Sequence, residues 1–499
     1  MNELLARLAD RVSTDPGSVV LETANETLTA FELHAAIRLF ADTLKSVDVK
    51  RLGLLAENSP GWIIADLACQ LADICLIPLP HFFSDTQLFN SMASAGVDTV
   101  LTDDPGRLHA IVPGHAEPFA CGEQYRLTLN AVDNPKSRAL PDGSRKITFT
   151  SGSTGAPRGV CLDNAQQLRV AHALAAAIGI TRPRHLCLLP LSTLLENIGG
   201  VYVPLLTDGT IIAPPGVDVG LGGSTGLSIP KMLQALERHQ PTSMIILPQM
   251  LVGLVAALED GWKPPASLEF VAVGGGKVSS ALIHLARNAG LPVYEGYGLS
   301  ETASVTCLNR AGCDLPGSAG QPLAHVDVSI ENDEIVVRGN TFLGYLDDQE
   351  SWYPESVATG DLGHFDAQGF LYISGRKKNV LISSFGRNIN PEWVESQLLS
   401  QPLLAQCFVF GDDRPWCIAL LAPADPDCTD QEIQAWIDLA NLDLPDYARI
   451  GAWYRLSERL TTEDGLMTDN GRPRRALIEQ HYGPIIDSLY SRPLTVNAS

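Results

Sequence analysis

Several signatures of metalloproteins and secreted proteins are missing from this sequence of 499 residues. The ten cysteines are scattered and no two stand in a CxxC spacing, so neither a zinc ribbon nor a disulfide framework is expected. The eleven histidines form no HExxH pair and no other metal-ligand spacing. The absence of these patterns favours a protein of the reducing cytoplasm.

Long apolar runs and positive charge are also scarce. The longest apolar stretch, residues 62–80, is interrupted by Asp66, Gln70 and Asp73, so we interpret it as core and expect no membrane insertion. No targeting segment is expected either. With 35 basic and 57 acidic residues, the net charge of -22 argues against nucleic acid or an anionic membrane as a partner. A site for a phosphorylated ligand must then supply its own local positive charge and a divalent cation.

The chain is too long for a single hydrophobic core, so two or more domains are expected. Helical and strand patterns alternate over most of the sequence, which is typical of layered α/β structure. Past Glu334 the pattern changes to short β-rich pieces with turns, and a basic segment follows at residues 376–378. We therefore predict a large N-terminal domain of layered α/β subdomains, residues 1–376, and a small α/β C-terminal domain, residues 377–499.

Local signals predict individual elements within these domains. Thr29 followed by Glu32 predicts a capping box at the start of a helix that runs to about residue 45. Ser59 and Pro60 predict the opening of the next helix. The apolar patterns predict helices over 85–95, over 164–178 and from about 194, and strands over 53–56, 74–80, 99–102, 186–189 and 268–273.

The most informative segment spans residues 147–160, with the sequence ITFTSGSTGAPRGV. A β-prone entry leads into six small residues, and Arg158 follows between a proline and a glycine. Backbone N–H groups and hydroxyls in such a loop can cradle phosphate oxygens, and Arg158 adds a fixed positive charge. The GxxxxGK[ST] pattern of P-loop NTPases is absent, and an ordinary surface loop is the alternative. The candidate phosphate-binding residues are Thr150, Ser151, Gly152, Ser153, Thr154 and Gly155.

A second segment, residues 293–302, places an aromatic ring between two glycines and a carboxylate just beyond it. Gly296 and Gly298 bracket Tyr297, which lets the ring lie flat against another ring such as a purine. Glu301 follows closely enough to hold a Mg²⁺ ion that bridges phosphates. The same composition also occurs in loops with a purely structural role, so this segment alone does not establish a nucleotide site.

A third segment contains Thr359, Gly360 and Asp361, and Arg376 stands fifteen residues beyond that aspartate. An aspartate can accept both hydroxyls of a ribose, while a guanidinium can donate to the same sugar or to a phosphate. The first three residues alone would also fit a plain turn. With Arg376 added, the pattern favours recognition of a nucleoside.

In this order, the segments resemble the motifs of the adenylate-forming superfamily, which includes acyl-CoA synthetases, aryl-CoA ligases, luciferases and the adenylation domains of peptide synthetases. TSGSTGxPxGV resembles the family's phosphate loop, and YGLSE differs from its YGxTE motif by a serine that keeps the hydroxyl. Residues 334–339 with Gly344 and Tyr345 match a further family segment, which we interpret as structural. The resemblance covers essentially the whole chain.

The resemblance implies a ligase that uses ATP and Mg²⁺ to convert a carboxylic acid to an acyl-adenylate, releases pyrophosphate and then transfers the acyl group to a thiol. The implied nucleotide contacts are adenine stacking by Tyr297, phosphate contact by Ser300, Mg²⁺ binding by Glu301, ribose binding by Asp361 and Arg376, and further ATP contacts from Gly274, Gly275, Gly276, Glu295, Gly296 and Gly298.

The resemblance also implies that the small C-terminal domain is mobile and rotates between the two half-reactions. Lys378 occupies the family's hinge position, and Gly386 would line the tunnel for the thiol. Thr193 and Gly276 occupy positions that border the acyl pocket.

Two positions depart from the family pattern. Arg158 stands where most relatives carry a lysine, and Arg472, in the sequence DNGRPRR, aligns with the C-terminal lysine that contacts the carboxylate and the α-phosphate. Arginine keeps the charge but is broader and planar, so we expect adenylation to persist at a reduced rate. A basic, exposed tail segment is the alternative interpretation of this cluster. The catalytic candidates are Arg472, Arg158, Glu301 and Thr150.

Residues 189–197, LPLSTLLEN, resemble the long-chain fatty acyl branch, and so does the lysine at the hinge. No aspartate that would hold an amino acid's ammonium group stands between residues 189 and 200. We therefore predict a fatty or other hydrophobic acid as the substrate. The acceptor is coenzyme A or, alternatively, the phosphopantetheine of an acyl carrier protein. A non-catalytic nucleotide- or acyl-binding homologue is a further alternative, and both a monomer and a homodimer stay open.

Overall fold

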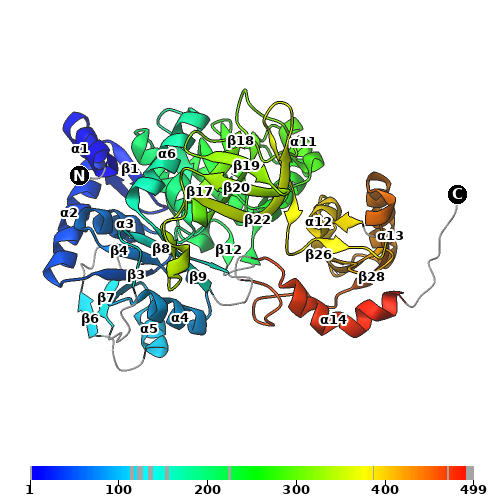
Figure 1. Cartoon of the computed structure of the whole chain (residues 1–499). Helices are drawn as coiled ribbons and strands as arrows, with labels where there is room; N and C mark the ends of the chain where they lie inside the picture. Colours follow the sequence, from blue (N-terminus) through cyan, green and yellow to red (C-terminus); the bar gives the residue numbers. More distant parts are fainter. Residues whose placement is uncertain are drawn as a thin grey trace.

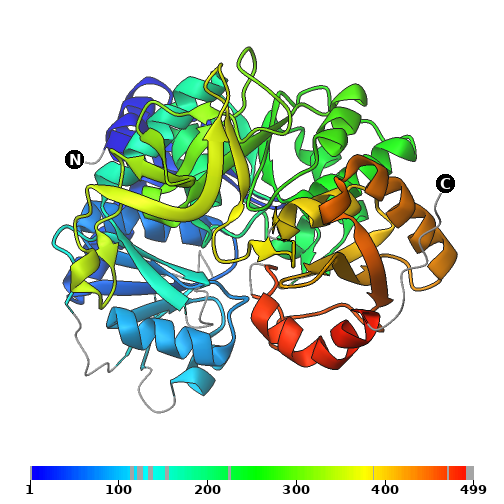
Figure 2. The same cartoon turned by 45° about the vertical axis from the view of Figure 1, so that its right-hand side comes forward.

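The computed structural model describes residues 3–112, 117–120, 127–132, 139–151, 157–222, 226–385, 387–468 and 471–490. A large N-terminal region contains three main sheets with helices packed on them, and a smaller C-terminal region has its own three-stranded sheet (Figure 1). The C-terminal region, orange and red in Figure 2, lies next to the N-terminal region. The predicted mixed α/β fold class is confirmed.

The first sheet carries the glycine-rich loop. Its strand order is β21-β9-β8-β4-β3-β5-β7-β6, and β3 lies parallel to β4 and β5 while β4 lies parallel to β8. The loop leaves β8 at the edge formed by the carboxyl ends of these parallel strands, which is where open α/β sheets bind ligands. The strands are β3 (Arg51–Leu55), β4 (Cys75–Pro78), β5 (Thr99–Thr102), β6 (Glu117–Ala120), β7 (Thr128–Ala131), β8 (Lys146–Ser151), β9 (Pro157–Leu162) and β21 (Gly344–Tyr345).

Capping residues define where several helices begin. The Thr29 hydroxyl accepts from the Glu32 N–H and the Glu32 carboxylate accepts from the Thr29 N–H, which is the predicted capping box. Ser59 caps the next helix and Pro60 takes its first position, as predicted. The helices are α1 (Glu3–Thr14), α2 (Ala30–Ser46), α3 (Pro60–Ala72), α4 (Asp85–Ala95), α5 (Pro105–Ile111) and α6 (Asn164–Ile178). Among the helices the structure describes, none is long and apolar enough to cross a membrane.

The second sheet has nine strands in the order β18-β17-β16-β15-β14-β10-β11-β1-β2. Helices α9, α10 and α11 cover one face through a cluster of buried apolar side chains, and α6, α7 and α8 belong to the larger cluster on the other face. The elements are β1 (Val19–Glu22), β2 (Thr27–Thr29), β10 (Arg184–Leu186), α7 (Leu194–Glu196), α8 (Val203–Leu206), β11 (Thr210–Ile212), α9 (Ile229–His239), β14 (Ser243–Ile246), α10 (Pro248–Glu259), β15 (Phe270–Val273), α11 (Ser280–Asn288), β16 (Val293–Leu299), β17 (Ser304–Leu308) and β18 (Gln321–Pro322).

The strand predicted over residues 186–189 is wrong in its bounds, because β10 ends at Leu186. The apolar run continues past the strand since these residues are buried in the core as irregular chain. The Leu189 N–H donates to the buried Glu196 carboxylate instead of to a neighbouring strand. The helix predicted from about residue 194 does begin there as α7, and it continues as a π-helical stretch over Asn197–Tyr202.

The third sheet is antiparallel and holds the short β-rich pieces that the sequence predicts beyond residue 334. Its order is β19-β20-β22-β23. The strands are β19 (Asp327–Glu331), β20 (Glu334–Arg338), β22 (Ser356–Phe365) and β23 (Leu371–Arg376). Two small hairpins stand apart from it: β12 (Leu221–Gly222) with β13 (Gly226–Leu227), and β24 (Leu381–Ile382) with β25 (Asn388–Ile389).

The C-terminal region packs its helices on a sheet of order β26-β27-β28 and has two apolar clusters of its own. Separate clusters of this kind are typical of an independent domain. Its elements are α12 (Pro391–Leu398), β26 (Leu404–Phe410), β27 (Cys417–Pro423), α13 (Asp430–Asp443), β28 (Ile450–Arg455) and α14 (Arg475–Tyr490).

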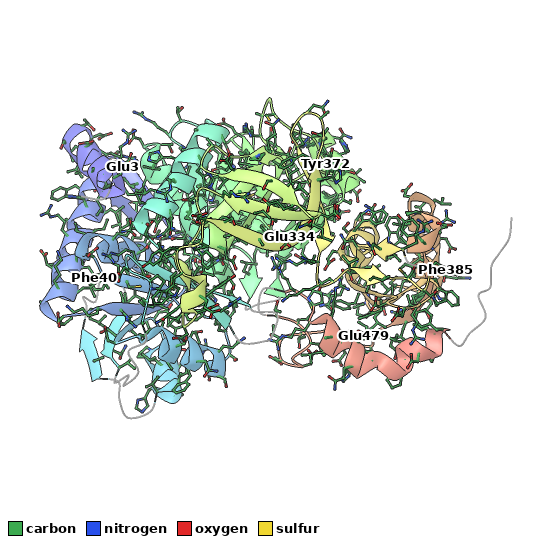
Figure 3. All side chains as sticks on the ribbon, in the orientation of Figure 1. Glu3, Phe40, Glu334, Tyr372, Phe385 and Glu479 are labelled. Carbon is green, nitrogen blue, oxygen red and sulfur yellow. The ribbon has the colours of Figure 1, made fainter. Side chains whose placement is uncertain are left out.

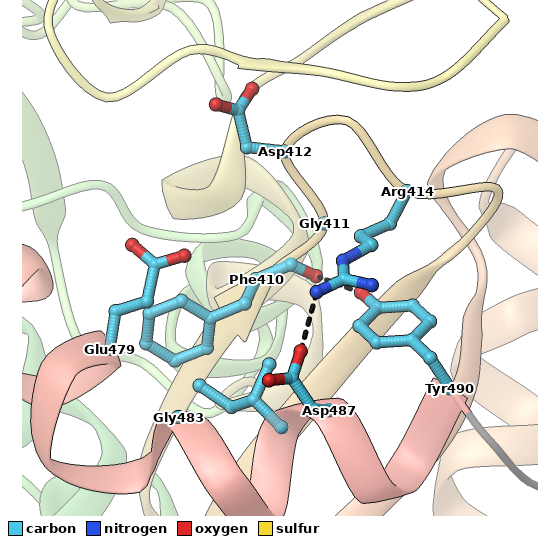
Figure 4. A pocket seen from close by; sticks show the side chains of 9 residues that line it. Phe410, Gly411, Asp412, Arg414, Glu479, Gly483, Asp487 and Tyr490 are labelled. Atoms are coloured by element: carbon cyan, nitrogen blue, oxygen red, sulfur yellow. Dashed lines mark hydrogen bonds and ion pairs between the residues drawn. The ribbon is translucent and has the colours of Figure 1, made fainter.

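Arg414 anchors the end of α14 to this sheet (Figure 4). Its guanidinium lies over the Tyr490 ring, 4.8 Å from the centroid, and contacts the Asp487 carboxylate. The Tyr490 hydroxyl donates to the Trp416 carbonyl oxygen over 3.1 Å. These contacts close one side of a surface pocket of about 160 Å³. Of the residues that the sequence nominates for the nucleotide or acyl sites, none that the structure describes lines it.

A buried ion pair joins β8 to α3, and the helical segment after α7 hydrogen-bonds to both of its partners. The Lys146 ammonium lies 3.0 Å from Asp66 Oδ1, and the two side chains are 3% and 0% exposed. Lys146 also donates to the Tyr202 hydroxyl over 2.8 Å and to Asn197, while Tyr202 and Asn197 both donate to Asp66 Oδ2. Burial lowers the pKa of Lys146, and Asp66 opposes that shift.

Replacing Lys146→Met is expected to destabilise the N-terminal region by about 3–5 kcal/mol, because it leaves the Asp66 carboxylate buried without its cation. The measurement is thermal and denaturant unfolding of the variant beside the parent protein. Lys45→Met, at an exposed lysine in the last turn of α2, is the matched control and should change stability little. Equal losses in both variants would show that the pair is not structurally important.

Candidate active site

Three of the predicted nucleotide-binding residues meet where β16 and the β22–β23 hairpin come together. Asp361 and Arg376 are register partners in that hairpin, and Arg376 Nε lies 2.7 Å from Asp361 Oδ1. The Tyr297 hydroxyl donates to Asp361 Oδ2 over 2.6 Å. Burial raises the pKa of Asp361 although Arg376 and Tyr297 oppose the shift. The carboxylate is therefore held in one orientation, and it has lone pairs left for ribose hydroxyls.

Glu334 on β20 fixes the turn that presents Asp361. Figure 3 labels Glu334 on the ribbon of the third sheet. Glu334 Oε1 accepts from the Gly360 N–H over 2.9 Å, and its Oε2 lies 3.0 Å from Lys377 Nζ. The hydrogen bond from Lys377 is the main cause that lowers the pKa of Glu334. The contact ties the ribose-binding candidates to the first residue after β23.

The predicted Mg²⁺ ligand, Glu301, and the arginine of the phosphate loop, Arg158, both contact Tyr345. The Tyr345 hydroxyl donates to Glu301 Oε1 over 2.8 Å. The Arg158 guanidinium stacks on the Tyr345 ring, 3.6 Å from the centroid, and its Nη2 lies 2.9 Å from Asp348 Oδ2. Burial and Glu301 together raise the pKa of Tyr345 well above its usual value. One carboxylate oxygen of Glu301 is thus bonded to Tyr345. The other is a ligand of the kind that Mg²⁺ prefers.

Tyr345 and Asp348 were missed as site residues by the sequence analysis, which interpreted the segment at Gly344 and Tyr345 as structural. Both belong to a turn that β21 docks antiparallel on β9, where Tyr345 pairs with Val160. Nothing in the local sequence reveals that pairing. The aromatic ring followed by an acidic pair at residues 347–348 is the one signal that was available.

Arg472 reaches the N-terminal region from the C-terminal one. Its Nη2 donates to the Gly275 carbonyl oxygen over 3.4 Å, and Gly275 has φ of +81°, a conformation that favours glycine. Loss of water around the guanidinium and the neighbouring Arg376 lower the pKa of Arg472, while Asp361 and Glu301 raise it. The arginine therefore lies within electrostatic reach of both carboxylates nominated for the nucleotide and the metal ion.

A tight turn presents the Arg472 side chain. The Thr468 hydroxyl accepts from the Arg472 N–H over 3.0 Å, and the Thr468 N–H donates to the Arg472 carbonyl over 2.7 Å. A bridge between Met467 and Pro473 closes the base of this turn. These contacts fix the backbone of the turn, while the Arg472 side chain itself is exposed.

The other predicted site residues are placed as follows. Glu295 accepts from the Gly317 N–H over 2.7 Å, and burial raises its pKa to about 7. Ser300 begins the short 3-10 turn that carries Glu301. A Cβ on Gly298 would lie 1.9 Å from the Ser304 carbonyl oxygen, so this glycine permits the close approach of β17. The Thr150 hydroxyl lies 3.4 Å from the Arg158 carbonyl oxygen on the paired strand.

Some of the predicted residues lie outside the described residues, and others are located here only by the element that carries them. Gly152, Ser153, Thr154, Gly155 and Gly386 lie outside the described residues. Ser151 ends β8, Lys378 lies in the turn after β23, and Thr193 precedes α7. Gly274 and Gly276 flank Gly275 in the turn that follows β15, and Gly296 pairs with Leu308.

An internal cavity lies beside these elements, between the second sheet and the α6 to α8 segments. Its walls are almost entirely apolar and include Leu195, Gly199, Phe270, Val305 and Leu308. Thr193 and Gly276, the residues predicted to border the acyl pocket, are not among those that line it. Its free volume is about 40 Å³, whereas a cavity of roughly 150 Å³ accepts benzene. A ring would enter only when lining side chains move aside.

Two family models match the chain. The model described as AMP-binding enzyme matches residues 8–346, and the model described as AMP-binding enzyme C-terminal domain matches residues 378–493. Curated relatives include the 2-succinylbenzoate–CoA ligase of Bacillus subtilis (strain 168), 28% identical over 434 residues that cover 82% of this chain and 85% of that protein. The enzyme of the same name from Bacillus velezensis is 29% identical over 442 residues, with the same coverage of both chains.

Solved structures show the same fold. An anthranilate CoA ligase in complex with anthranoyl-AMP has a TM-score of 0.81 at 17% identity and covers 96% of both chains. The o-succinylbenzoate CoA synthetase of Bacillus subtilis in complex with AMP has a TM-score of 0.76 at 25% identity and covers 95% of this chain and 98% of that one. The acids in these names are aromatic, so these relatives do not support the predicted fatty acyl branch.

Proposed function

The chain belongs to the AMP-binding enzyme family, and from this premise we propose that it activates a carboxylic acid with ATP and transfers the acyl group to coenzyme A. In the first step the acid's carboxylate attacks the α-phosphorus of ATP, which gives the acyl-adenylate and pyrophosphate. In the second step a thiol attacks the acyl carbonyl and displaces AMP. The observation that carries the proposal is the position of Arg472, which contacts the Gly275 carbonyl oxygen and whose charge interacts with those of Glu301 and Asp361.

Transfer of this type needs little covalent help from the protein, so placement and charge neutralisation supply most of the rate. We assign Asp361 and Tyr297 to holding the nucleoside, and Arg472 to balancing the negative charge where carboxylate and phosphate meet. Glu301 offers a carboxylate oxygen for Mg²⁺, which would neutralise phosphate charge when bound. Arg158 supplies positive charge from β9 at the base of the glycine-rich loop.

For the acid we propose an aromatic carboxylic acid in place of the fatty acid predicted from the sequence. The relatives named above act on aromatic acids. The walls of the apolar cavity suit an apolar group, and at about 40 Å³ it admits a ring only when lining side chains move aside. Coenzyme A is the proposed acceptor because the curated relatives are named CoA ligases.

We propose further that the chain divides between residues 376 and 377 and that the C-terminal domain turns about Lys378 before the thiol attacks. Separate apolar clusters in the two regions support a division there. In the present arrangement Arg472 contacts the turn at Gly275, which supports the assignment of this form to adenylation.

The test is pyrophosphate release from ATP and Mg²⁺ across a panel of aromatic and fatty acids, with coenzyme A present or absent and the products identified by mass spectrometry. An aryl-CoA product would support the proposal. Release with fatty acids alone would overturn the aromatic assignment. An adenylate that accumulates despite coenzyme A would indicate a carrier-protein acceptor, and ATP binding without pyrophosphate release would indicate a non-catalytic homologue.

A further inference from the structure

An ordered polar array stands in the wall of the apolar cavity. His185 on β10 and Ser243 on β14 are register partners on neighbouring parallel strands, and both line the cavity. His185 Nδ1 lies 3.0 Å from Ser243 Oγ, and its Nε2 lies 3.1 Å from Oε1 of Glu196. The three residues are 4%, 6% and 0% exposed. Among the described residues that line the cavity, His185 and Ser243 alone carry polar side chains.

Packing around the array leaves no freedom for Glu196. Its second oxygen accepts from the Leu189 N–H over 3.2 Å. A Cβ on Gly200 would lie 2.7 Å from Glu196 Oε1 and 3.0 Å from His185 Cδ2, so any larger residue there would displace the pair. The glycine-containing π-helical stretch therefore makes room for a carboxylate in the core.

The hydrogen bonds of the array leave one group available to a ligand. The buried Glu196 carboxylate requires a hydrogen-bond donor, and the His185 Nε2–H supplies it. His185 Nδ1 is then the nitrogen that bonds with the Ser243 hydroxyl. A hydroxyl has one donor and two acceptor positions, and only one of these three is engaged by His185. Because Ser243 lines the cavity, the two hydrogen-bonding positions that remain on its Oγ are available to a ligand there. No lysine or arginine is among the described lining residues, so nothing there would balance an additional negative charge.

The array does not fit a metal site. Ligand atoms of His185, Cys187 and Glu196 lie within 4.8 Å of one another. Both imidazole nitrogens are however already engaged, and burial raises the pKa of the Cys187 thiol well above its usual value, which keeps the thiol protonated.

The cavity borders β17, the strand that pairs with β16, which carries Tyr297. Val305 and Leu308, which line it, are the register partners of Gly298 and Gly296 on either side of Tyr297. Tyr297 itself pairs with Cys307 and faces the other side of the sheet. The ring of an activated acid would therefore have to pass Gly296 and Gly298, which carry no side chain, to enter the cavity.

We propose that Ser243, held by His185 and Glu196, recognises a neutral hydrogen-bonding substituent, a hydroxyl or primary amine, on the ring of the activated acid. The inference rests on the proposed function and narrows its substrate class. A second carboxylate on the ring is disfavoured, because Glu196 already supplies a negative charge and the cavity wall has no cation to pair with another.

The test compares benzoate, its hydroxy and amino derivatives at each ring position and the benzenedicarboxylates. We expect at least one hydroxy- or aminobenzoate to exceed benzoate about tenfold or more in kcat/KM for pyrophosphate release, because an unfilled polar site penalises the plain ring. Ser243→Ala should remove that preference, so that the substituted acid and benzoate are used equally well. Ser91→Ala, at a buried serine of α4 on the first sheet, is the matched control and should keep the preference.

Binding of the same acids, measured by calorimetric titration, separates this inference from the proposed function. If no acid releases pyrophosphate, the proposed activity is wrong, and the binding preference and its loss in Ser243→Ala still decide the role of the array. A preference that survives Ser243→Ala, or tighter binding of a dicarboxylate or of benzoate, would overturn the inference.

Discussion

Arg472→Ala is expected to lower the rate of acyl-adenylate formation by about 10²–10³-fold, the loss typical when one fixed electrostatic contact to a transition state is removed. Arg472 donates to the Gly275 carbonyl and lies within electrostatic reach of Glu301 and Asp361, where the reacting carboxylate and phosphate would meet. The ribose contacts come from Asp361 and Tyr297 in the N-terminal region, so ATP binding should change much less. The measurement is single-turnover formation of acyl-AMP, with nucleotide affinity determined separately.

The second half-reaction tests whether Arg472 acts in the first step alone. Arg472→Ala should still transfer an acyl group from a preformed acyl-adenylate to the thiol, because the proposal assigns Arg472 to the first step. Arg472→Lys keeps the charge as a point donor and should retain activity within about tenfold. Arg459→Ala, at an exposed arginine of the same region that donates to the Ala424 carbonyl, is the matched control. If Arg472→Ala and Arg459→Ala form acyl-AMP equally fast, Arg472 is not catalytic.

Local signals were sufficient for much of the fold. The capping box at Thr29 and Glu32, and Pro60 behind Ser59, define helix starts through contacts among residues three or fewer positions apart. The strand at residues 186–189 was misplaced because burial of irregular chain and strand pairing both select apolar residues. Only the position of β10 between β11 and β14 separates the two.

The site residues likewise fall into those that sequence motifs predicted and those that they did not. Tyr297, Asp361 and Arg376 were nominated from motifs, and the hairpin register then brings two of them together. Tyr345 and the array of His185, Ser243 and Glu196 were not found, since their roles depend on pairings between distant segments. Glu196 at the end of the apolar helix α7 was a weak signal, because the sequence does not reveal which strand faces that helix.

Glu301→Gln is expected to reduce acyl-adenylate formation by a factor on the order of 10² and to raise the Mg²⁺ concentration required for half-maximal rate, because it removes the charge from the carboxylate assigned to the metal. Tyr345 holds Glu301 Oε1 through a hydrogen bond of 2.8 Å, so it acts as a positioning residue. Tyr345→Phe should shift the Mg²⁺ requirement in the same direction but by less. It should also free Glu301 to rotate without changing its charge.

The measurement is the initial rate of pyrophosphate release as a function of Mg²⁺ concentration at fixed ATP. Glu350→Gln removes an exposed carboxylate close in sequence to Asp348, and this control should leave the Mg²⁺ curve in place. A role confined to folding would lower the maximal rate of Glu301→Gln without moving the Mg²⁺ midpoint, and that result would refute the metal assignment. A displaced midpoint in both Glu301→Gln and Tyr345→Phe would place the metal ion beside the hydrogen-bonded pair, where Arg158 stacks on the same ring.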